Sequence, residues 1–225
     1  MRKLLTVALA FGLSLGFSQD LMAQKVLKEG KVNFEISYPD LPEEAKAYAS
    51  MLPSEMIMYF KKEMARVEIS MGMGESVTIT NSETGELIQL MDLMGNKYAT
   101  KMSKEDLEEN QEDAPEFEVE YSDETREIAG YTCKKAVVSA EGSTVDVWYT
   151  EDLEVKAQSG NRNPMLENVK GFPMEYSVTQ GQLTMVFSAT SVEKEKVDGE
   201  LFEIPDDYEI KTPEEFRSAV GGMGG

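Results

Sequence analysis

The sequence predicts a mainly β domain, a curved antiparallel sheet of about ten strands that stays unclosed, as a half-barrel does, with one covering helix. Three observations lead to this fold class. Apolar and polar residues alternate with a period of two in many short runs, glycine-containing turns separate the runs, and one internal segment has clear helical spacing. Turns this short join neighbouring strands in antiparallel order. We therefore expect a single domain over residues 25–220.

The first strand has the clearest alternation. In residues 31–38 (KVNFEISY), Val32, Phe34 and Ile36 share one face while Asn33 and Glu35 occupy the other. This pattern is typical of a half-buried strand with one face in water. The same alternation recurs along the chain, in residues 66–71, 76–80, 116–121, 144–149, 172–178 and 183–189.

Residues 40–53 (DLPEEAKAYASMLP) interrupt the strands. Pro42 followed by two glutamates favours a helix start, and Pro53 favours a stop. We expect a helix of about three turns that lies against the apolar face of the sheet, either as a fixed plug or as a movable lid. A second helix is predicted after Pro213. The stripe that the first helix would bury consists of Leu41, Ala45, Tyr48 and Leu52.

The N-terminal segment, residues 1–24, has the layout of a secretory signal peptide. Arg2 and Lys3 precede an uncharged run over 4–17, and small residues follow at Ser18 and Ala23. The run is short for a membrane span, so we expect an exported, periplasmic or secreted chain without a transmembrane segment in its mature form. The Gly-rich residues 221–225 are expected to be a disordered tail.

Composition excludes several classes of function. Twenty-two Lys and Arg against 42 Asp and Glu give a net charge of −20, which argues against nucleic acid and anionic lipid as partners. The chain has no His, so Ser-His-Asp and Cys-His catalysis and His-based zinc sites are excluded. Cys133 has no second cysteine to pair with, and we expect a buried structural thiol. We expect no catalytic residue, no metal and no cofactor.

Two further features have two interpretations each. Nine of the 15 methionines lie between Met51 and Met102, which indicates either an adaptable core filler or an apolar cavity. The acidic residues 103–127 indicate a solvated surface loop, because the spacing of a calcium-binding loop is missing.

The alternation predicts an apolar pocket on the concave face of the sheet. Its ligand would be a lipid or the acyl chain of a lipoprotein. The alternative is a protein-interaction or envelope stress-sensing domain with a packed interior, whose sheet edge or acidic loop binds an envelope protein. The residues predicted to line the pocket are Phe34, Ile36, Met58, Phe60, Ile69, Met71, Leu90, Met185 and Phe187.

Several sequence phrases resemble a known family. They include residues 58–61 (MYFK), 90–98 (LMDLMGNKY), 128–135 (IAGYTCKK) and 202–208 (FEIPDDY). Their order over residues 30–210 resembles the DUF4412-type exported domain and, more remotely, the LolA/LolB-like lipoprotein-carrier superfamily. The resemblance implies a LolA-like half-barrel with helical plugs and an apolar concave surface that holds acyl chains. It supplies no catalytic residue, so a non-enzymatic periplasmic binding protein is the expectation.

Overall fold

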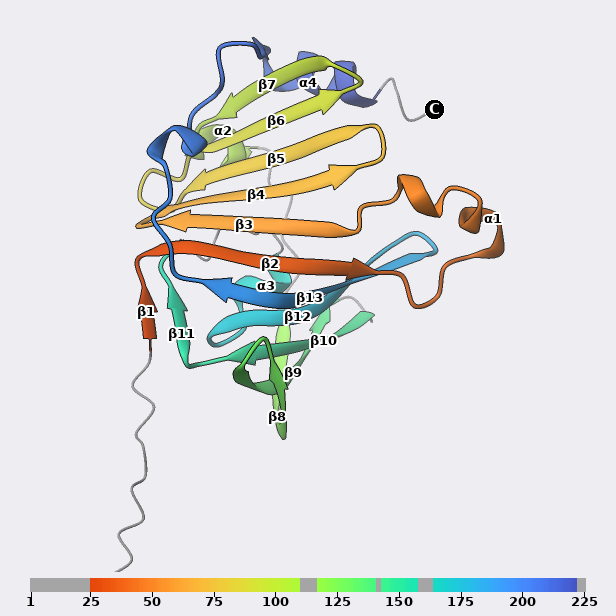
Figure 1. Cartoon of the computed structure of the whole chain (residues 1–225), viewed down its shortest axis with the longest axis vertical. Helices are drawn as coiled ribbons and strands as arrows, with labels where there is room; N and C mark the ends of the chain where they lie inside the picture. Colours follow the sequence, from red (N-terminus) through yellow and green to blue (C-terminus); the bar gives the residue numbers. More distant parts are fainter. Residues whose placement is uncertain (1–24, 110–116, 141–142, 158–163, 222–225) are drawn as a thin grey trace, which may run out of the picture.

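The computed structural model describes residues 25–109, 117–140, 143–157 and 164–221 (Figure 1). The predicted signal peptide, residues 1–24, lies outside the described residues, as do residues 222–225 of the predicted tail. Gly221, which we expected to begin that tail, is instead the last residue of a helix. No helix within the described ranges is long and apolar enough to span a membrane.

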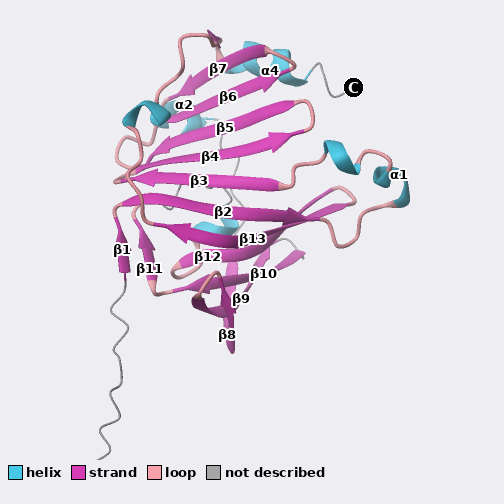
Figure 2. Cartoon of the chain, in the orientation of Figure 1, coloured by secondary structure: helices cyan, strands magenta, loops and turns pink. Residues whose placement is uncertain are grey.

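Strands dominate the chain, as predicted (Figure 2). The strands are β1 (Lys25–Leu27), β2 (Glu29–Ser37), β3 (Glu55–Lys61), β4 (Met64–Met71), β5 (Gly74–Asn81), β6 (Leu87–Leu93), β7 (Asn96–Met102), β8 (Glu118–Ile128), β9 (Tyr131–Ala140), β10 (Ser143–Thr150), β11 (Leu153–Val155), β12 (Phe172–Gln180), β13 (Leu183–Glu193) and β14 (Glu209–Ile210). The helical segments are α1 (Glu43–Lys46), η1 (Ala49–Met51), α2 (Lys104–Glu109), α3 (Pro164–Glu167), η3 (Gly199–Phe202) and α4 (Pro213–Gly221).

Twelve strands form one open sheet in the order β14-β7-β6-β5-β4-β3-β2-β13-β12-β10-β9-β8, and β1 pairs with β11 in a separate two-stranded sheet. Each strand from β2 to β7 pairs antiparallel with the next, and β13 pairs antiparallel with β2. Figure 1 shows the sheet bending, so that β8 and β9 run almost across the direction of β3 to β7. The predicted fold class is confirmed, with more strands than the ten expected.

The inner core is the cluster of buried side chains on the face shared by Val32, Phe34 and Ile36 of β2. Their neighbours on β3 are Met56 and Met58, because Phe34 pairs with Met56 and Val32 with Met58. Strands β9, β10, β12 and β13 bend round to the same cluster, and Leu166 of α3 joins it. The curved sheet therefore buries one face against itself.

Beyond β4 the buried face of the sheet changes sides. Val67 of β4 pairs with Thr78, and Glu68 pairs with Val77. Directly paired residues point to the same side of a sheet, so Val77 lies on the face opposite Val67. The outer core is the resulting second cluster of buried residues, which consists of Val77, Ile79, Leu90, Ala99, Val197 and Phe202.

Residues 194–208 cover this second face. Phe202 is only 3% exposed, and the Arg66 guanidinium donates a hydrogen bond to the carbonyl oxygen of Leu201 at 2.8 Å. Farther along, Lys97 Nζ donates to Asp207 at 2.7 Å, a bond that raises the pKa of Lys97 and lowers that of Asp207. The C-terminal segment is thus part of the core of the domain.

The helix predicted after Pro213 is confirmed as α4. Thr212 and Glu215 form a capping box, in which the Thr212 backbone N–H donates to the Glu215 carboxylate at 3.0 Å and the Glu215 N–H to the Thr212 hydroxyl at 3.3 Å. Phe216 of this helix is buried. Immediately before this helix, β14 pairs in parallel with β7 and so covers the outer edge of that strand.

The predicted three-turn helix over residues 42–53 was wrong. The segment holds only α1 and η1, and neither contains a buried residue. Tyr48 leaves the helical region, with φ −110° and ψ 9°, and its side chain is 63% exposed. The stripe of Leu41, Ala45, Tyr48 and Leu52 therefore does not cover the sheet.

The acidic stretch is also more regular than predicted. It contributes α2, which Ser103 begins by accepting a hydrogen bond from the Asp106 backbone N–H at 3.2 Å, and most of the edge strand β8. The remaining residues, 110–116, lie outside the described part of the chain. Acidic side chains on an edge strand disfavour pairing with another chain of the same charge, which is a local reason for this composition.

The covering segment gives a test of the fold. Replacing Phe202 by Ala removes the largest side chain of the outer core and leaves a cavity, so the free energy of unfolding should fall by about 3–5 kcal/mol. Tyr48→Ala is the matched control, because its exposed ring should contribute no more than about 0.5 kcal/mol. Urea unfolding followed by circular dichroism measures both. Equal losses in the two variants would contradict the assignment of Phe202 to a core.

Candidate functional site

The predicted pocket is a packed core at most of its predicted positions. The structure brings together five of the predicted lining side chains on the inner face, and all are at most 7% exposed. Side chains with so little accessible surface are in contact with other protein atoms over almost their whole surface. These residues are Phe34, Ile36, Met58, Phe60 and Phe187.

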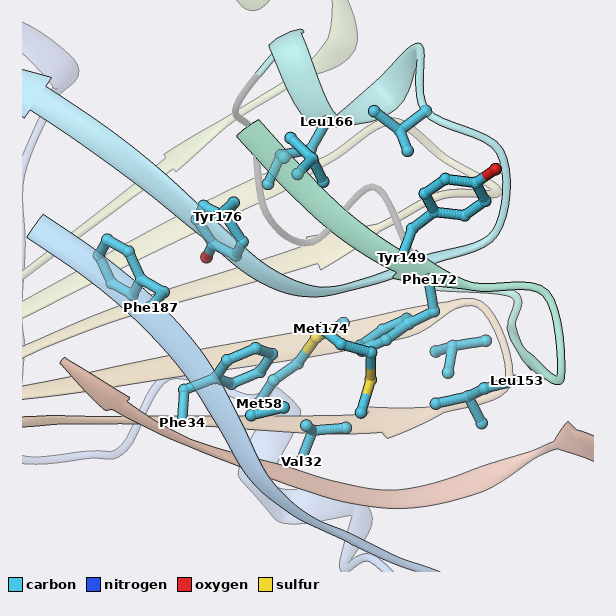
Figure 3. Packing of buried hydrophobic residues seen from close by; sticks show 14 of the residues in the cluster. Val32, Phe34, Met58, Tyr149, Leu153, Leu166, Phe172, Met174, Tyr176 and Phe187 are labelled. Atoms are coloured by element: carbon cyan, nitrogen blue, oxygen red, sulfur yellow. The ribbon is translucent and has the colours of Figure 1, made fainter. Parts of the chain in front are cut away.

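An aromatic cluster fills the centre of the inner core (Figure 3). The Tyr176 ring stacks on Phe187 with ring centroids 5.0 Å apart, and it meets Phe34 edge-on at 6.4 Å. Tyr176 was not among the predicted lining residues. The alternation of β12, which places Met174 and Tyr176 on one face, was the signal that could have identified it.

Three predicted lining residues keep partial exposure on the same face. Ile69 and Met185 pack against the margin of the inner core, and Met71 lies two residues beyond Ile69 on β4. They lie where β4 ends and β13 begins, at the end of the sheet that carries α1 (Figure 1).

Leu90 was assigned to the wrong face. It pairs with Val77 and belongs to the outer core, on the other side of the sheet from the remaining predicted residues. The two-residue turn between Met71 and Gly74 held the necessary signal. Such a turn pairs its flanking residues directly, which places Ser76, and not Val77, on the face of Ile69.

Among the hollows of the described surface, two lie beside the strands of the large sheet. The first, with a volume of about 390 Å³, includes Glu35 and Glu55, which are direct cross-strand partners and make it acidic. The second, of about 330 Å³, lies beside Phe202 and is largely apolar. Phe34 is the one predicted lining residue found in these two hollows. The other members of the first are Asn33, Ser54, Met56, Ile57 and Thr190, and those of the second are Met64, Ile79, Thr80, Asn81, Glu86, Ile88, Lys101, Glu203 and Ile204.

Trp148 is half-buried and packs against the edge of the inner core. The Arg126 guanidinium lies 4.1 Å from the centre of its indole ring and forms an ion pair with Glu175. Ser188 donates a hydrogen bond to Glu175. The cluster joins β8, β10, β12 and β13, and it is arranged as a fixed cross-strand contact rather than as an open site. Its members are too far apart in the sequence for a motif to reveal them.

Cys133 confirms the prediction of a buried thiol. Its side chain is fully inaccessible, and burial is the main cause that raises its pKa to about 11, with Glu127 adding to the effect. A protonated, inaccessible thiol is a poor nucleophile. Within the described ranges, no three Cys, Asp or Glu side chains come together in a way that could hold a metal ion.

The state of Cys133 predicts a pH response. The folded chain keeps the thiol protonated up to about pH 11, whereas an unfolded thiol ionises near pH 9, so this group should lower stability as pH rises between those values.

The burial of Cys133 can be tested by labelling. A chromogenic disulfide reagent should not label the native chain at neutral pH and should label it fully in denaturant. Rapid labelling of the native chain would contradict the burial, and Cys133→Ala serves as the unlabelled control.

Two solved structures share this fold. Both are of PNGF-II, in its P21 and C2 crystal forms, with a TM-score of 0.54 in each case and 21% and 22% sequence identity. The alignments cover 86% of this chain but only 33% and 32% of the PNGF-II chains, so the chain spans about a third of their length. MucB is less similar, with a TM-score of 0.33 and 9% identity over 83% of this chain and 61% of that chain.

No curated protein sequence matches the chain. The findings give no support to a DUF4412 or LolA assignment, and that resemblance stays a prediction. A sequence model of the family described as "N-glycanase peptide, N-terminal domain" matches residues 58–202. Because this match covers more than half of the 225 residues, the chain belongs to the N-glycanase peptide N-terminal domain family.

Proposed function

We propose that this chain is a non-catalytic interaction domain that binds a protein partner through its surface. The observation that carries the proposal is the packing of the inner core, in which Phe34, Met58 and Phe60 are at most 3% exposed. The concave face that would hold an acyl chain is occupied at these positions by the side chains of the protein itself. A packed interior favours the interaction domain over the ligand carrier.

The chemistry of the side chains supports a non-catalytic role. The chain contains no His, which is the commonest general acid and base, and its one thiol is buried with a raised pKa. Arg126, the cation next to the one Trp, is already engaged by Glu175. We propose that the domain contributes binding and no reaction of its own.

The family supports an accessory role. Its description names an N-terminal domain of an N-glycanase, and the PNGF-II chains are about three times as long as the part that aligns. We propose that this domain, like many modules of larger extracellular proteins, provides a contact surface. The N-terminal sequence features favour an exported, periplasmic or secreted location, where an envelope protein would be the partner.

An apolar ligand is the second candidate, favoured by one observation. Ile69, Met71 and Met185 remain partly exposed at the margin of the inner core, where the end of a lipid or a lipoprotein acyl chain could rest. Methionine adapts to such chains because its side chain is flexible and polarizable. A ligand held here would contact the margin and not the centre of the inner core.

Lipid binding separates the two candidates. The full chain, purified from a host that exports it, should show the mass of the protein alone in native mass spectrometry, and a dansyl-labelled fatty acid at micromolar concentration should not become fluorescent on mixing. The physical reason is the lack of accessible apolar surface in the inner core.

The margin provides the matched variant. Saturable fatty-acid binding that is lost in Ile69→Gln but kept in Ile210→Gln, an exposed residue on β14, would overturn the proposal in favour of the apolar-ligand candidate. Unchanged fluorescence in all three proteins is the result expected for an interaction domain with a packed interior.

A further inference from the structure

Four exposed apolar side chains gather at one end of the large sheet. We name this group the methionine rim; it consists of Tyr48, Met51, Met73 and Met94, whose exposed fractions are 63%, 41%, 49% and 80%. They lie on η1 and its flank, on the β4–β5 turn and on the β6–β7 turn, all at the end of the sheet that carries α1 (Figure 1).

The three segments of the methionine rim are in direct contact. The Gly72 backbone N–H donates to the carbonyl oxygen of Met51 at 3.2 Å, and the Met94 N–H donates to that of Met73 at 3.0 Å. Gly72 also has no room for a side chain, since a Cβ there would lie 2.7 Å from the Cα of Met51. The rim is therefore one continuous surface, although its residues are up to 46 positions apart in the sequence.

Met94 is an unusual residue for its position. Its φ of 54° lies in the left-handed region, which Gly, Asn and Asp adopt at least cost. In a turn at the other end of the sheet, the residue with a similar backbone conformation is Lys62, with φ 55°. Lys62 is polar and exposed, as is usual at a turn. The left-handed conformation of Met94 costs conformational energy, and its exposed side chain adds no packing to the core in return. Such a local conflict between residue and backbone indicates a functional surface.

The border of the methionine rim is acidic. Glu43, Glu44, Glu55, Glu75 and Asp92 lie on the segments that carry it or flank it. The two nearest lysines are already paired, Lys46 with Glu43 at 2.5 Å and Lys97 with Asp207 at 2.7 Å. An apolar centre with an acidic border complements a partner that has an apolar face flanked by basic residues.

We propose that the methionine rim is the docking surface for a basic amphipathic segment of a partner protein, an inference that rests on the proposed interaction function. Methionines suit this role because they repack around different apolar side chains. The acidic border and the net charge of −20 disfavour the other occupants, which are a second copy of this chain and an anionic membrane.

A designed peptide tests the proposal. The probe is a fluorescein-labelled helix with Leu at the i, i+3, i+4 and i+7 positions and Lys elsewhere, and its partner probe carries Glu in place of Lys. The full chain should bind the Lys probe and not the Glu probe in fluorescence anisotropy. Affinity should fall several-fold when salt is raised from about 0.05 to 0.5 M, because the acidic border is screened.

The variant Met73→Ser/Met94→Asn locates the contact. It should weaken the Lys probe about tenfold or more without lowering the melting temperature, since both side chains are exposed and Asn tolerates the left-handed conformation. Ile210→Ser, which removes a 69% exposed apolar side chain outside the rim, is the matched control and should bind within about twofold of the unmodified chain.

Several outcomes would overturn the docking proposal. These are failure of the unmodified chain to bind the Lys probe, equal binding by the double variant, or a rim-dependent dimer or vesicle complex in sedimentation. In each case, failure of the labelled fatty acid to bind would leave the broader interaction function standing. Fatty-acid binding at the margin would instead remove that function.

Discussion

The change of buried face between β4 and β5 determines how the rest of the chain must be arranged. Strands β2 to β4 bury the side that carries Val67, whereas β5 to β7 bury the opposite side through Val77 and Leu90. The bent sheet can cover only the first of these faces with its own strands. The second needs a separate cover, and residues 194–208 provide it with Phe202 and with backbone carbonyls that accept hydrogen bonds from Lys61 and Arg66.

The same arrangement explains why the concave side is a core and not an open pocket. Tyr176 and Phe187 come from strands that bend over β2 and β3, and their rings fill the space above Phe34. The apolar residues that stay partly exposed lie at the end of the sheet that carries α1, in the margin of the inner core and in the methionine rim. Recognition at that end is compatible with a rigid scaffold, because loops at the end of a sheet can vary without disturbing its centre.

Much of the fold could be predicted from alternation alone, since Val32, Phe34 and Ile36 show both a strand and its buried face. The predicted lining residues on the inner face lie together in a buried cluster. Periodicity tells which side chains turn inward but not whether other side chains fill the space between them. Leu90 failed for a different reason: its face depends on the register across two turns. The helix over 42–53 failed because helical spacing of apolar residues does not ensure a continuous helix, and Tyr48 leaves the helical conformation between α1 and η1.

The position of β2 has a kinetic consequence. Although it is among the first strands made, its two neighbours are β3, which follows at once, and β13, whose partner residue Ala189 lies 155 positions after Phe34. Until β13 arrives, one edge of β2 is unpaired and the aromatic cluster lacks Phe187. Contacts of such long range slow folding because the loop must close before they form. While that edge of β2 is unpaired, it is a site at which a partly folded chain can associate with other chains.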